Sequence, residues 1–471
     1  MNKSKFGKKT VIKNILYSVS ANLISLLVSV VLVLVLPNLL GETSYGYWQL
    51  YLFYTSYVGF FHFGWIDGIF LRIGGEEYDD LDRQLYATQF VILMIFEIVV
   101  GIIVANVANL IIPDVNKLHV IVLTCICMVI YIAKNYTTYI LQATNRIKPY
   151  AFVTLIEKVV FAVAILGAWI IRTSSYEVIA VGDLLGKLIA MLVSLKYCKE
   201  ILFCKLGNWK RTLKEIWINL SVGSKLVLAN VASLLITGIV RFAIEDYWSI
   251  EVFGKVSLSM SLSNMLMVFI SAISIVVFPM LKRMDEEKLG ETYEMIRNFI
   301  MFVLLAALTF YYPAKCILTG LLPSYAESMR YMALMFPVCI FDSKISLLIN
   351  TYLKALRKEK EILIINVISV VLSLISTVMT VYMLHSLECA VVSIVVLLAF
   401  KCVIAELYLS KCMEIHVKKD MIMELILVSL FILTGWFLDN WFSMGFYLIF
   451  FLIYCFIKKK DLIHLVKIIL K

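Results

Sequence analysis

Long apolar runs separated by short polar stretches dominate this sequence. Most runs are about twenty residues long, which is the length that an α-helix needs to cross about 30 Å of hydrocarbon. The pattern therefore predicts an all-α protein that crosses a membrane many times. We expect about fourteen spans, which lie over residues 15–36, 45–70, 86–112, 118–141, 150–171, 177–195, 219–243, 252–278, 298–321, 329–353, 361–384, 388–409, 421–438 and 442–457.

A tight turn joins the first two runs, and a similar stretch of sequence occurs later in the chain. Residues 37–48 close one run and open the next, so the two segments should lie antiparallel. The similar stretch at 251–257 follows about 208 residues later, and 141–148 resembles 353–360 at an offset of about 212. Two pairs of similar segments, separated by nearly the same number of residues, indicate a duplicated half of roughly 200 residues.

Each predicted half holds six spans, so both halves should enter the membrane in the same orientation. The sequence thus predicts two six-helix bundles, at 1–200 and 201–410, related by a parallel pseudo-twofold repeat. Residues 411–471 would add two helices and a basic tail. The stretch 196–217 is short and basic and contains Gly207 and Asn208, which is typical of a linker.

Composition supports a membrane location. The chain is 62% hydrophobic and only 16% charged, and its mean hydropathy is +0.92. A soluble protein of 471 residues would carry far more charged surface. We therefore interpret the chain as a polytopic membrane protein.

Basic residues gather on one side of the predicted spans. The formal net charge of +10 is therefore a signal of topology and does not indicate a nucleic-acid partner. This distribution places both termini in the cytoplasm. The residues that define the inner side are Lys3, Lys5, Lys8, Lys9, Lys13, Arg146, Lys148, Lys196, Lys199, Lys205, Lys210, Arg211, Lys214, Lys282, Arg283, Lys288, Arg297, Lys354, Arg357, Lys358, Lys360, Lys411, Lys418, Lys419, Lys458, Lys459 and Lys460.

No sequence pattern indicates a metal, a cofactor or a nucleotide. The ten cysteines are scattered, without a paired framework or zinc spacing. No phosphate-binding P-loop motif occurs, so ATP hydrolysis has no support. The first apolar run continues to Pro37 without a cleavage pattern, so we expect it to be retained as a span.

Seven cations lie inside predicted spans and need an explanation. A lone Lys or Arg at the bilayer centre costs roughly 2.5–3.5 kcal/mol on insertion scales. Such residues face a polar cavity, pair with an acid, or extend their charged end toward the interface. The seven are Lys134, Lys158, Lys187, Lys225, Arg241, Lys344 and Lys401.

Some of these cations have acidic neighbours in the sequence. Glu157 adjoins Lys158. Asp183 precedes Lys187 by one helical turn, so the two side chains can form an ion pair, which is either structural or functional. Lys134 and Lys158 lie toward the inner ends of their spans, where they can reach the interface.

Three further residues complete the set of intramembrane candidates. Asp342 lies two positions before Lys344 and points to another side of the helix, and Lys401 could pair only loosely with Glu406. His62 and Asp67 lie near the inner end of the second span, with Arg72 or a neighbouring span as the partner expected for Asp67. These two are either structural or take part in ion coupling.

Several motifs, in order along the chain, resemble one known family. The chain is similar to polysaccharide-type flippases of the multidrug/oligosaccharidyl-lipid/polysaccharide exporter superfamily. The arginine and aspartate pattern that marks lipid II flippases on the first helix is absent. The matching motifs are Leu40-Gly41 with Tyr45-Gly46, Gly64-Trp65-Ile66-Asp67-Gly68, Leu141-Gln142-Ala143 with Arg146, Arg241 with Phe253-Gly254, Phe278-Pro279, Leu322 to Ser328, and Asn350 to Ala355.

The resemblance implies a function without catalysis. Such proteins move an oligosaccharide on a polyprenyl diphosphate from the inner to the outer leaflet of the bacterial cell membrane, for surface glycans such as O-antigen. Two helical bundles alternate between inward-open and outward-open states. The bilayer and the lipid-linked glycan are the implied partners, and a glycan polymerase and other assembly proteins are candidates. Along the substrate path we expect Arg241 and Lys225, followed by Lys134 and Lys344. Glu245 lies one helical turn from Arg241, and a local pair between them is the structural alternative for Arg241.

Two other classes stay open. A membrane-embedded polysaccharide polymerase or ligase would also be this apolar, but it normally carries catalytic residues on a large outer loop. The longest predicted outer loop, around 312–329, has Lys315 and Glu327 and little else. An ion-coupled drug exporter of the same superfamily would place acids in its cavity, whereas the intramembrane charge here leans positive.

The topology can be tested directly. We expect reporter fusions at Lys210 and Lys460 to show a cytoplasmic location, because the basic loops are retained on that side. A reporter fused at Lys117, on the opposite side, is the control. Exposure of Lys210 outside the cell would contradict this topology.

Overall fold

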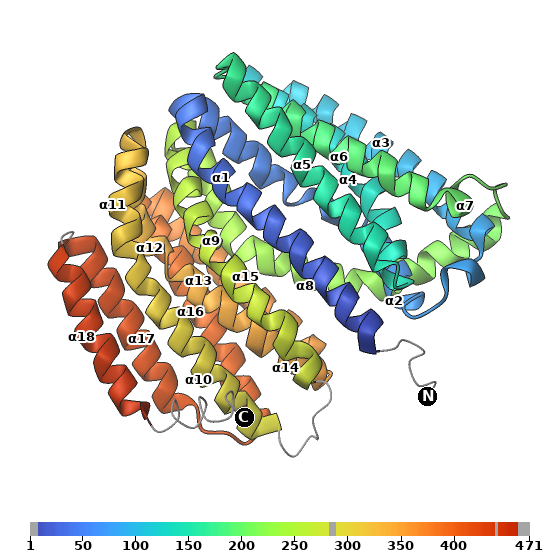
Figure 1. Cartoon of the computed structure of the whole chain (residues 1–471). Coiled ribbons are helices and arrows are strands. Elements are labelled where there is room, and N and C mark those ends of the chain that lie inside the picture. The colour runs from blue at the N-terminus through green and yellow to red at the C-terminus, as the bar shows by residue number, and fades with distance from the viewer. Residues whose placement is uncertain (1–7, 282–288, 439–440, 460–471) are drawn as a thin grey trace. The chain divides into compact units, whose positions relative to one another are not determined.

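The computed structural model describes residues 8–281, 289–438 and 441–459. All the regular elements in these ranges are helices (Figure 1), as the apolar runs predicted. The chain divides into two compact units, Met1–Val231 and Ala232–Lys471, and the division falls within one long helix, α8 (Trp209–Tyr247).

The first unit, Met1–Val231, is built on helices that belong to the predicted spans. The short α2 and α7 lie at the ends of longer helices. The elements are α1 (Lys8–Thr55), α2 (Trp65–Arg72), α3 (Arg83–Ile111), α4 (Val115–Ala143), α5 (Ile147–Ile171), α6 (Tyr176–Tyr197), α7 (Lys199–Leu202) and the first part of α8.

The second unit, Ala232–Lys471, takes the rest of the chain. Its elements are the end of α8, α9 (Ile250–Leu281), α10 (Leu289–Ala307), α11 (Tyr311–Leu321), α12 (Ala326–Met335), α13 (Val338–Ser343), α14 (Asn350–Ala355), α15 (Glu359–Thr377), α16 (Leu387–Cys412), α17 (Lys418–Leu433) and α18 (Trp441–Ile457).

Most of the predicted spans lie on helices, but the span predicted at 45–70 is interrupted, because α1 ends at Thr55 and α2 begins at Trp65. Among the described residues, ten helices are long and apolar enough to cross a membrane, and α18 is a shorter apolar helix. The predicted span 329–353 is wrong as one straight helix, because the helices 323–335 and 338–355 meet at an angle of 45°. Pro337 lies at this bend and has no N–H to continue the hydrogen-bond ladder.

The predicted turn at 37–48 is a kink within α1 rather than a loop. Only Gly41 leaves the helical conformation there, with φ 73° and ψ 175°. A positive φ is accessible to glycine at little cost, so this one residue can redirect the chain. The tight connection is thus made by a single glycine.

Helix α4 is central to the core of the first unit. It packs against α1, α2, α3, α5 and α6. Its buried residues Met128, Ile132 and Tyr136 join one apolar cluster with Trp65 of α2 and Leu93 of α3. Because one helix contacts most of the others, residues on α4 are placed next to groups far away in the sequence.

Three glycines let the backbones of α2 and α8 meet within the first unit. A Cβ on Gly68 would lie 2.0 Å from the Asn219 carbonyl oxygen, and one on Gly223 would lie 1.9 Å from that of Gly64. No side chain fits at these distances. At the end of α2, Arg72 Nη1 donates to Asn219 Oδ1 at 2.6 Å and fastens the crossing.

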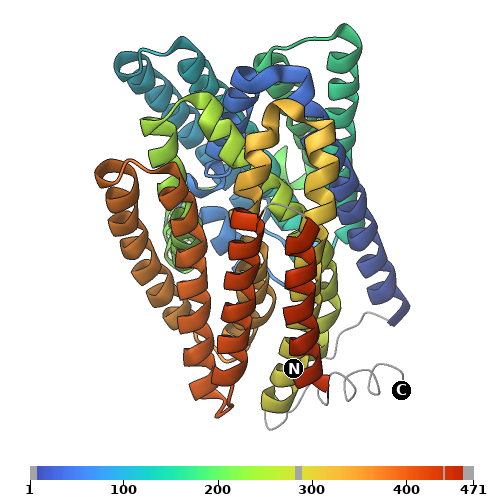
Figure 2. The same ribbon diagram turned by 90° about the vertical axis from the view of Figure 1, so that its left-hand side faces the viewer.

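Helices α17 and α18 are part of the second unit. They lie side by side (Figure 2, orange-red and red) and pack against α10. The Phe431 ring of α17 contacts Tyr311 at 5.3 Å and Tyr447 of α18 at 5.5 Å, between ring centres. This aromatic packing joins the last two helices to the preceding ones.

The glycine crossing yields a stability prediction. We expect Gly68→Ala and Gly223→Ala each to destabilise the purified protein by about 1–3 kcal/mol, because the added methyl overlaps backbone atoms. Thermal unfolding in detergent measures the effect.

Gly167→Ala is the matched control, since a Cβ there meets nothing within 4 Å. It should be neutral or stabilising by up to about 1 kcal/mol, as for alanine in a helix interior. Equal stability of Gly68→Ala and Gly167→Ala would refute the close crossing.

Candidate substrate path and buried ion pairs

Two ion pairs lie in the interior of the first unit. Lys134 Nζ of α4 contacts Glu157 Oε2 of α5 at 2.6 Å, and both residues are buried. On α6, Lys187 pairs with Asp183 one turn away, as the sequence spacing allowed. Tyr51 Oη of α1 donates to Asp183 Oδ2 at 2.7 Å. Two amines and two carboxylates thus form a neutral set that ties α1, α4, α5 and α6 together.

The pairing corrects two expectations about local charge. Lys134 does not extend to the interface, because the carboxylate of Glu157 neutralises it within the core. Glu157 therefore pairs with Lys134, while its sequence neighbour Lys158 is half-buried. Packing of α4 on α5, which the sequence does not show, decides this partner.

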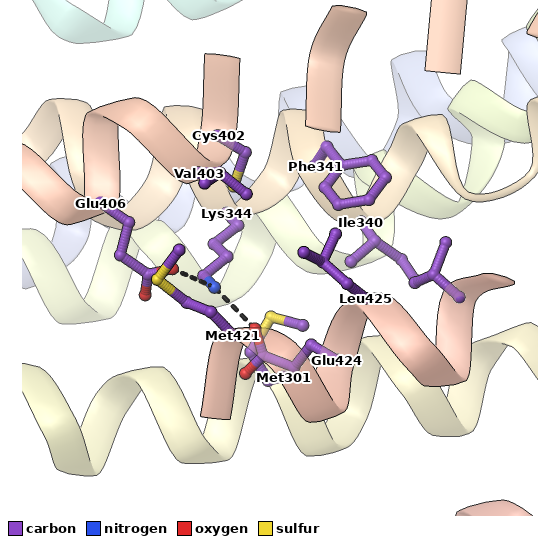
Figure 3. A pocket seen from close by; sticks show the side chains of 11 residues that line it. Met301, Ile340, Phe341, Lys344, Cys402, Val403, Glu406, Met421, Glu424 and Leu425 are labelled. Atoms are coloured by element: carbon purple, nitrogen blue, oxygen red, sulfur yellow. Dashed lines mark hydrogen bonds and ion pairs between the residues drawn. The ribbon is translucent and has the colours of Figure 1, made fainter. Parts of the chain in front are cut away.

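A larger network lies in the second unit. Lys344 Nζ contacts Glu406 Oε2 at 2.6 Å and Glu424 Oε2 at 2.7 Å, so that it bridges α16 and α17 (Figure 3). Arg297 of α10 contacts the same two carboxylates, at 2.6 Å through Nε and 2.8 Å through Nη1. Arg297 and Glu406 are almost completely buried. These four residues are called the unit 2 ion network below.

The network extends toward one end of the bundle. Asp420 Oδ2 lies 3.5 Å from Arg297 Nη1 and 2.7 Å from Lys458 Nζ. Tyr293 Oη donates to Glu406 at 3.1 Å. Three cations and three carboxylates therefore balance, which is what burial of charge in a low-dielectric interior requires.

A small recess adjoins Lys344. It is mostly apolar, because side chains such as Met301, Phe341, Val403 and Leu425 line it beside the ion network (Figure 3). The structure thus places Lys344 in a neutralised cluster, although we expected it along a substrate path. Its contacts with two acids hold α16 to α17, and its place along a substrate path stays a prediction.

Lys401 and Asp342 lie apart from this network. The loose Lys401–Glu406 pair expected from the sequence does not form, because Glu406 is taken by Arg297 and Lys344. Lys401 Nζ of α16 donates instead to Ser233 Oγ of α8 at 2.8 Å. Asp342 is partly buried on α13, which packs against α16.

His62 and Asp67 come together in the first unit. His62 Nε2 lies 3.6 Å from Asp67 Oδ2, and His62 Nδ1 accepts a hydrogen bond from the Gly64 N–H at 3.1 Å. A neutral ring that accepts at Nδ1 carries its proton on Nε2, which faces the carboxylate. Arg72, which we expected as a partner of Asp67, contacts Glu215 at 2.8 Å.

Arg241 and Lys225 both lie on α8 but in different units. Arg241 Nη2 donates to Ser257 Oγ of α9 at 3.0 Å, and the guanidinium lies 5.4 Å from the centre of the Phe253 ring. Lys225 is exposed within the apolar helix and has no hydrogen bond or ion pair with any residue that the structure describes. Lys225 therefore differs from Lys134, Lys187 and Lys344, which carboxylates neutralise.

Sequence reasoning missed three charged residues. Arg297 was assigned to the basic residues of the inner side, and Glu424 lies close to the start of the predicted span 421–438. Neither was therefore expected inside the bundle. Glu97 lies in the middle of the apolar run 86–112 and is completely buried. Its position within the run was a signal that could have identified it. Within the described ranges, no group of three or more His, Cys, Asp or Glu residues could hold a metal.

Comparisons with known proteins bear on the fold and the family. A family model described as polysaccharide biosynthesis protein matches residues 11–285, which is more than half of the chain. Among curated proteins, none matches the sequence significantly.

Several solved structures share the fold. A lipid II flippase in an inward closed conformation aligns over 96% of this chain and 100% of its own, with TM-score 0.63 and 13% identity. An outward-facing multidrug resistance transporter of the MATE family aligns over 88% and 99%, with TM-score 0.57 and 12% identity. A Pyrococcus furiosus transporter of the MOP superfamily, to which MATE proteins belong, aligns over 87% and 99%, with TM-score 0.52 and 12% identity.

These likenesses show the all-α fold of this transporter superfamily and confirm the resemblance that the motifs indicated.

The buried pairs allow a double-mutant test. We expect Lys134→Met or Glu157→Met alone to cost about 3–5 kcal/mol of stability, because each leaves a buried charge without its partner. The double variant should recover most of that loss, since no lone charge remains. Thermal unfolding of the purified variants measures this coupling.

A control pair is His119→Ala with Glu177→Ala, where the two side chains contact at 2.8 Å but are about half exposed. Coupling there should be within about 1 kcal/mol, as for exposed pairs. Additive effects at Lys134 and Glu157 would show that the two residues do not interact.

Proposed function

This chain belongs to the polysaccharide biosynthesis protein family, and on that premise we propose that it is a flippase for a lipid-linked oligosaccharide. It moves a glycan repeat unit on a polyprenyl diphosphate from the inner to the outer leaflet. The proposed location is the bacterial cell membrane, with both termini in the cytoplasm. The proposed partners after transport are a glycan polymerase and other assembly proteins.

The transport mechanism follows from the chemistry of the substrate. A diphosphate and a glycan headgroup cannot cross hydrocarbon unaided, so they need a polar path with positive charge. Alternating access between the two helical units would expose this path to one side at a time. The shared fold of transporters described as inward- and outward-facing supports such a cycle.

The observation that carries the proposal is the exposed charge of Lys225. An ammonium group inside an apolar helix is costly unless it is hydrated or paired. Carboxylates already neutralise Lys134, Lys187 and Lys344 within the units. Lys225 is therefore available to an anion, and the planar guanidinium of Arg241, which also contacts Ser257, is the second cation that we propose along the path.

A drug exporter is the second candidate, because multidrug transporters share this fold. Binding of cationic drugs would require acids that are free to face the ligand. Four buried acids, Glu157, Asp183, Glu406 and Glu424, are instead committed to cations. Because these acids are already paired with cations, an anionic substrate is favoured over a cationic one. The family and fold are those of membrane transporters, so a polymerase or ligase activity has less support.

Substitution of the two cations tests the proposal. We expect Arg241→Ala and Lys225→Ala each to lower export of the surface glycan about tenfold or more, which corresponds to about 1.4 kcal/mol of lost substrate interaction. Arg241→Lys should keep part of the activity, because the charge survives while the planar fork is lost. The measurement is glycan display in cells that lack the native copy, together with protein level in the membrane.

Lys214→Ala is the matched control, since Lys214 is an exposed lysine near the start of the same helix. It should leave export unchanged. Normal glycan display by both Arg241→Ala and Lys225→Ala would refute the proposed path. A loss that follows only from missing protein would make these residues structural.

A further inference from the structure

Glu97 is an acid buried in the centre of a membrane-spanning helix. It lies midway along α3 (Arg83–Ile111), about 21 Å from either end at 1.5 Å per residue. Its exposed fraction is 0%, and neither carboxyl oxygen has a hydrogen-bond partner among the described residues. Such a group requires an explanation, because buried polar atoms are almost always hydrogen-bonded.

The surroundings of Glu97 are apolar. Leu93 and Gly101 lie one turn away on the same buried face of α3. The register of the antiparallel helix α4 follows from two contacts. The Phe90 and Tyr136 rings lie 5.3 Å apart, and a Cβ on Gly101 would lie 3.7 Å from Cys125 Cβ. This register places Glu97 opposite residues 128–132, where the buried Met128 and Ile132 lie.

Nearby titratable groups on the neighbouring elements are engaged elsewhere or uncharged. On α4, Cys125 is a free thiol, the Tyr131 ring lies against Gly59 and 4.8 Å from Lys134 Nζ, and Lys134 is paired with Glu157. Phe63, before α2, packs on Phe96 at 6.2 Å, and the adjoining His62 is held by the Gly64 N–H and Asp67.

Helix α7 also packs on α3, but it approaches the other end. Its Glu200 lies 3.7 Å from Arg83, at the first residue of α3, and Lys199 precedes Glu200 on the same short helix. No cation in the described part of the chain therefore neutralises Glu97.

Glu97 thus differs from the other buried acids of the chain. Glu157, Asp183, Glu406 and Glu424 each contact a cation and can stay ionised. An ionised carboxylate without a partner is strongly disfavoured in an apolar interior, whereas a protonated carboxyl is neutral. A bound metal cation would need several oxygen ligands, and the buried Met128 and Ile132 opposite Glu97 provide none.

We propose that Glu97 is a proton-binding site, which holds a proton while α3 and α4 are packed and releases it when water enters their interface. Proton occupancy is thereby tied to the conformation of the first unit. One consequence rests on the proposed flippase function: the transport cycle becomes sensitive to proton concentration. Binding of the proton itself requires only the α3–α4 packing.

Infrared spectroscopy of the purified protein tests the site without any substrate. At neutral pH we expect the carbonyl stretch of a protonated carboxylic acid, which lies apart from the carboxylate bands. This band should be lost in Glu97→Gln, shifted in Glu97→Asp, and unchanged in the control Glu177→Gln. Glu177 is a suitable control because it is about half exposed and paired with His119.

Thermal unfolding provides a second measurement. The folded protein holds a proton that the unfolded chain releases, so stability should fall as the pH rises from about 6 to about 9. The Glu97→Gln variant should fold and should show a smaller fall, because it cannot lose that proton.

Two outcomes would overturn the proposal. One is an infrared spectrum of Glu97→Gln identical to that of the native protein at neutral pH. The other is loss of the native band on addition of sodium chloride at constant pH, which would indicate a metal cation in place of the proton. Neither readout depends on glycan export, so failure of the flippase proposal would leave this result intact.

Discussion

Charge inside hydrocarbon has to be neutralised, and this constraint determines how the helices of both units are held together. In the first unit, two positive groups are balanced by two negative ones, in the pairs Lys134–Glu157 and Lys187–Asp183. In the second, Arg297 and Lys344 are shared between Glu406 and Glu424. The pairs that join different helices stay intact only while those helices remain packed, since separation would leave a lone charge.

The ion pairs and the apolar packing have different roles. Apolar contacts supply little preference for one helix arrangement over another in a bilayer, because lipid tails are equally apolar. Directional contacts specify the arrangement instead. Lys344 selects the face of α17 through Glu424, and the glycines at 64, 68 and 223 select the crossing of α2 with α8. Breaking either contact therefore affects the architecture as well as the stability.

The same constraint distinguishes candidate functional charges from structural ones. Carboxylates neutralise Lys134, Lys187 and Lys344, so these residues have little capacity left for a substrate. Lys225, in contrast, remains exposed. Glu97 is the opposite case, a buried acid without a partner among the described residues, for which protonation is the remaining way to remove the charge.

The sequence by itself determined the membrane class and the positions of most spans, because the thickness of a bilayer fixes the length of an apolar run. It also indicated the Asp183–Lys187 pair, since partners one turn apart share a helix face. Only the tertiary structure decided the other partners. Lys134 and Glu157 are 23 residues apart, and Lys344 and Glu424 are 80 apart, on helices whose contact depends on packing. Likewise, the sequence showed an acid at position 97, but only the packing of α3 on α4 left it without a partner.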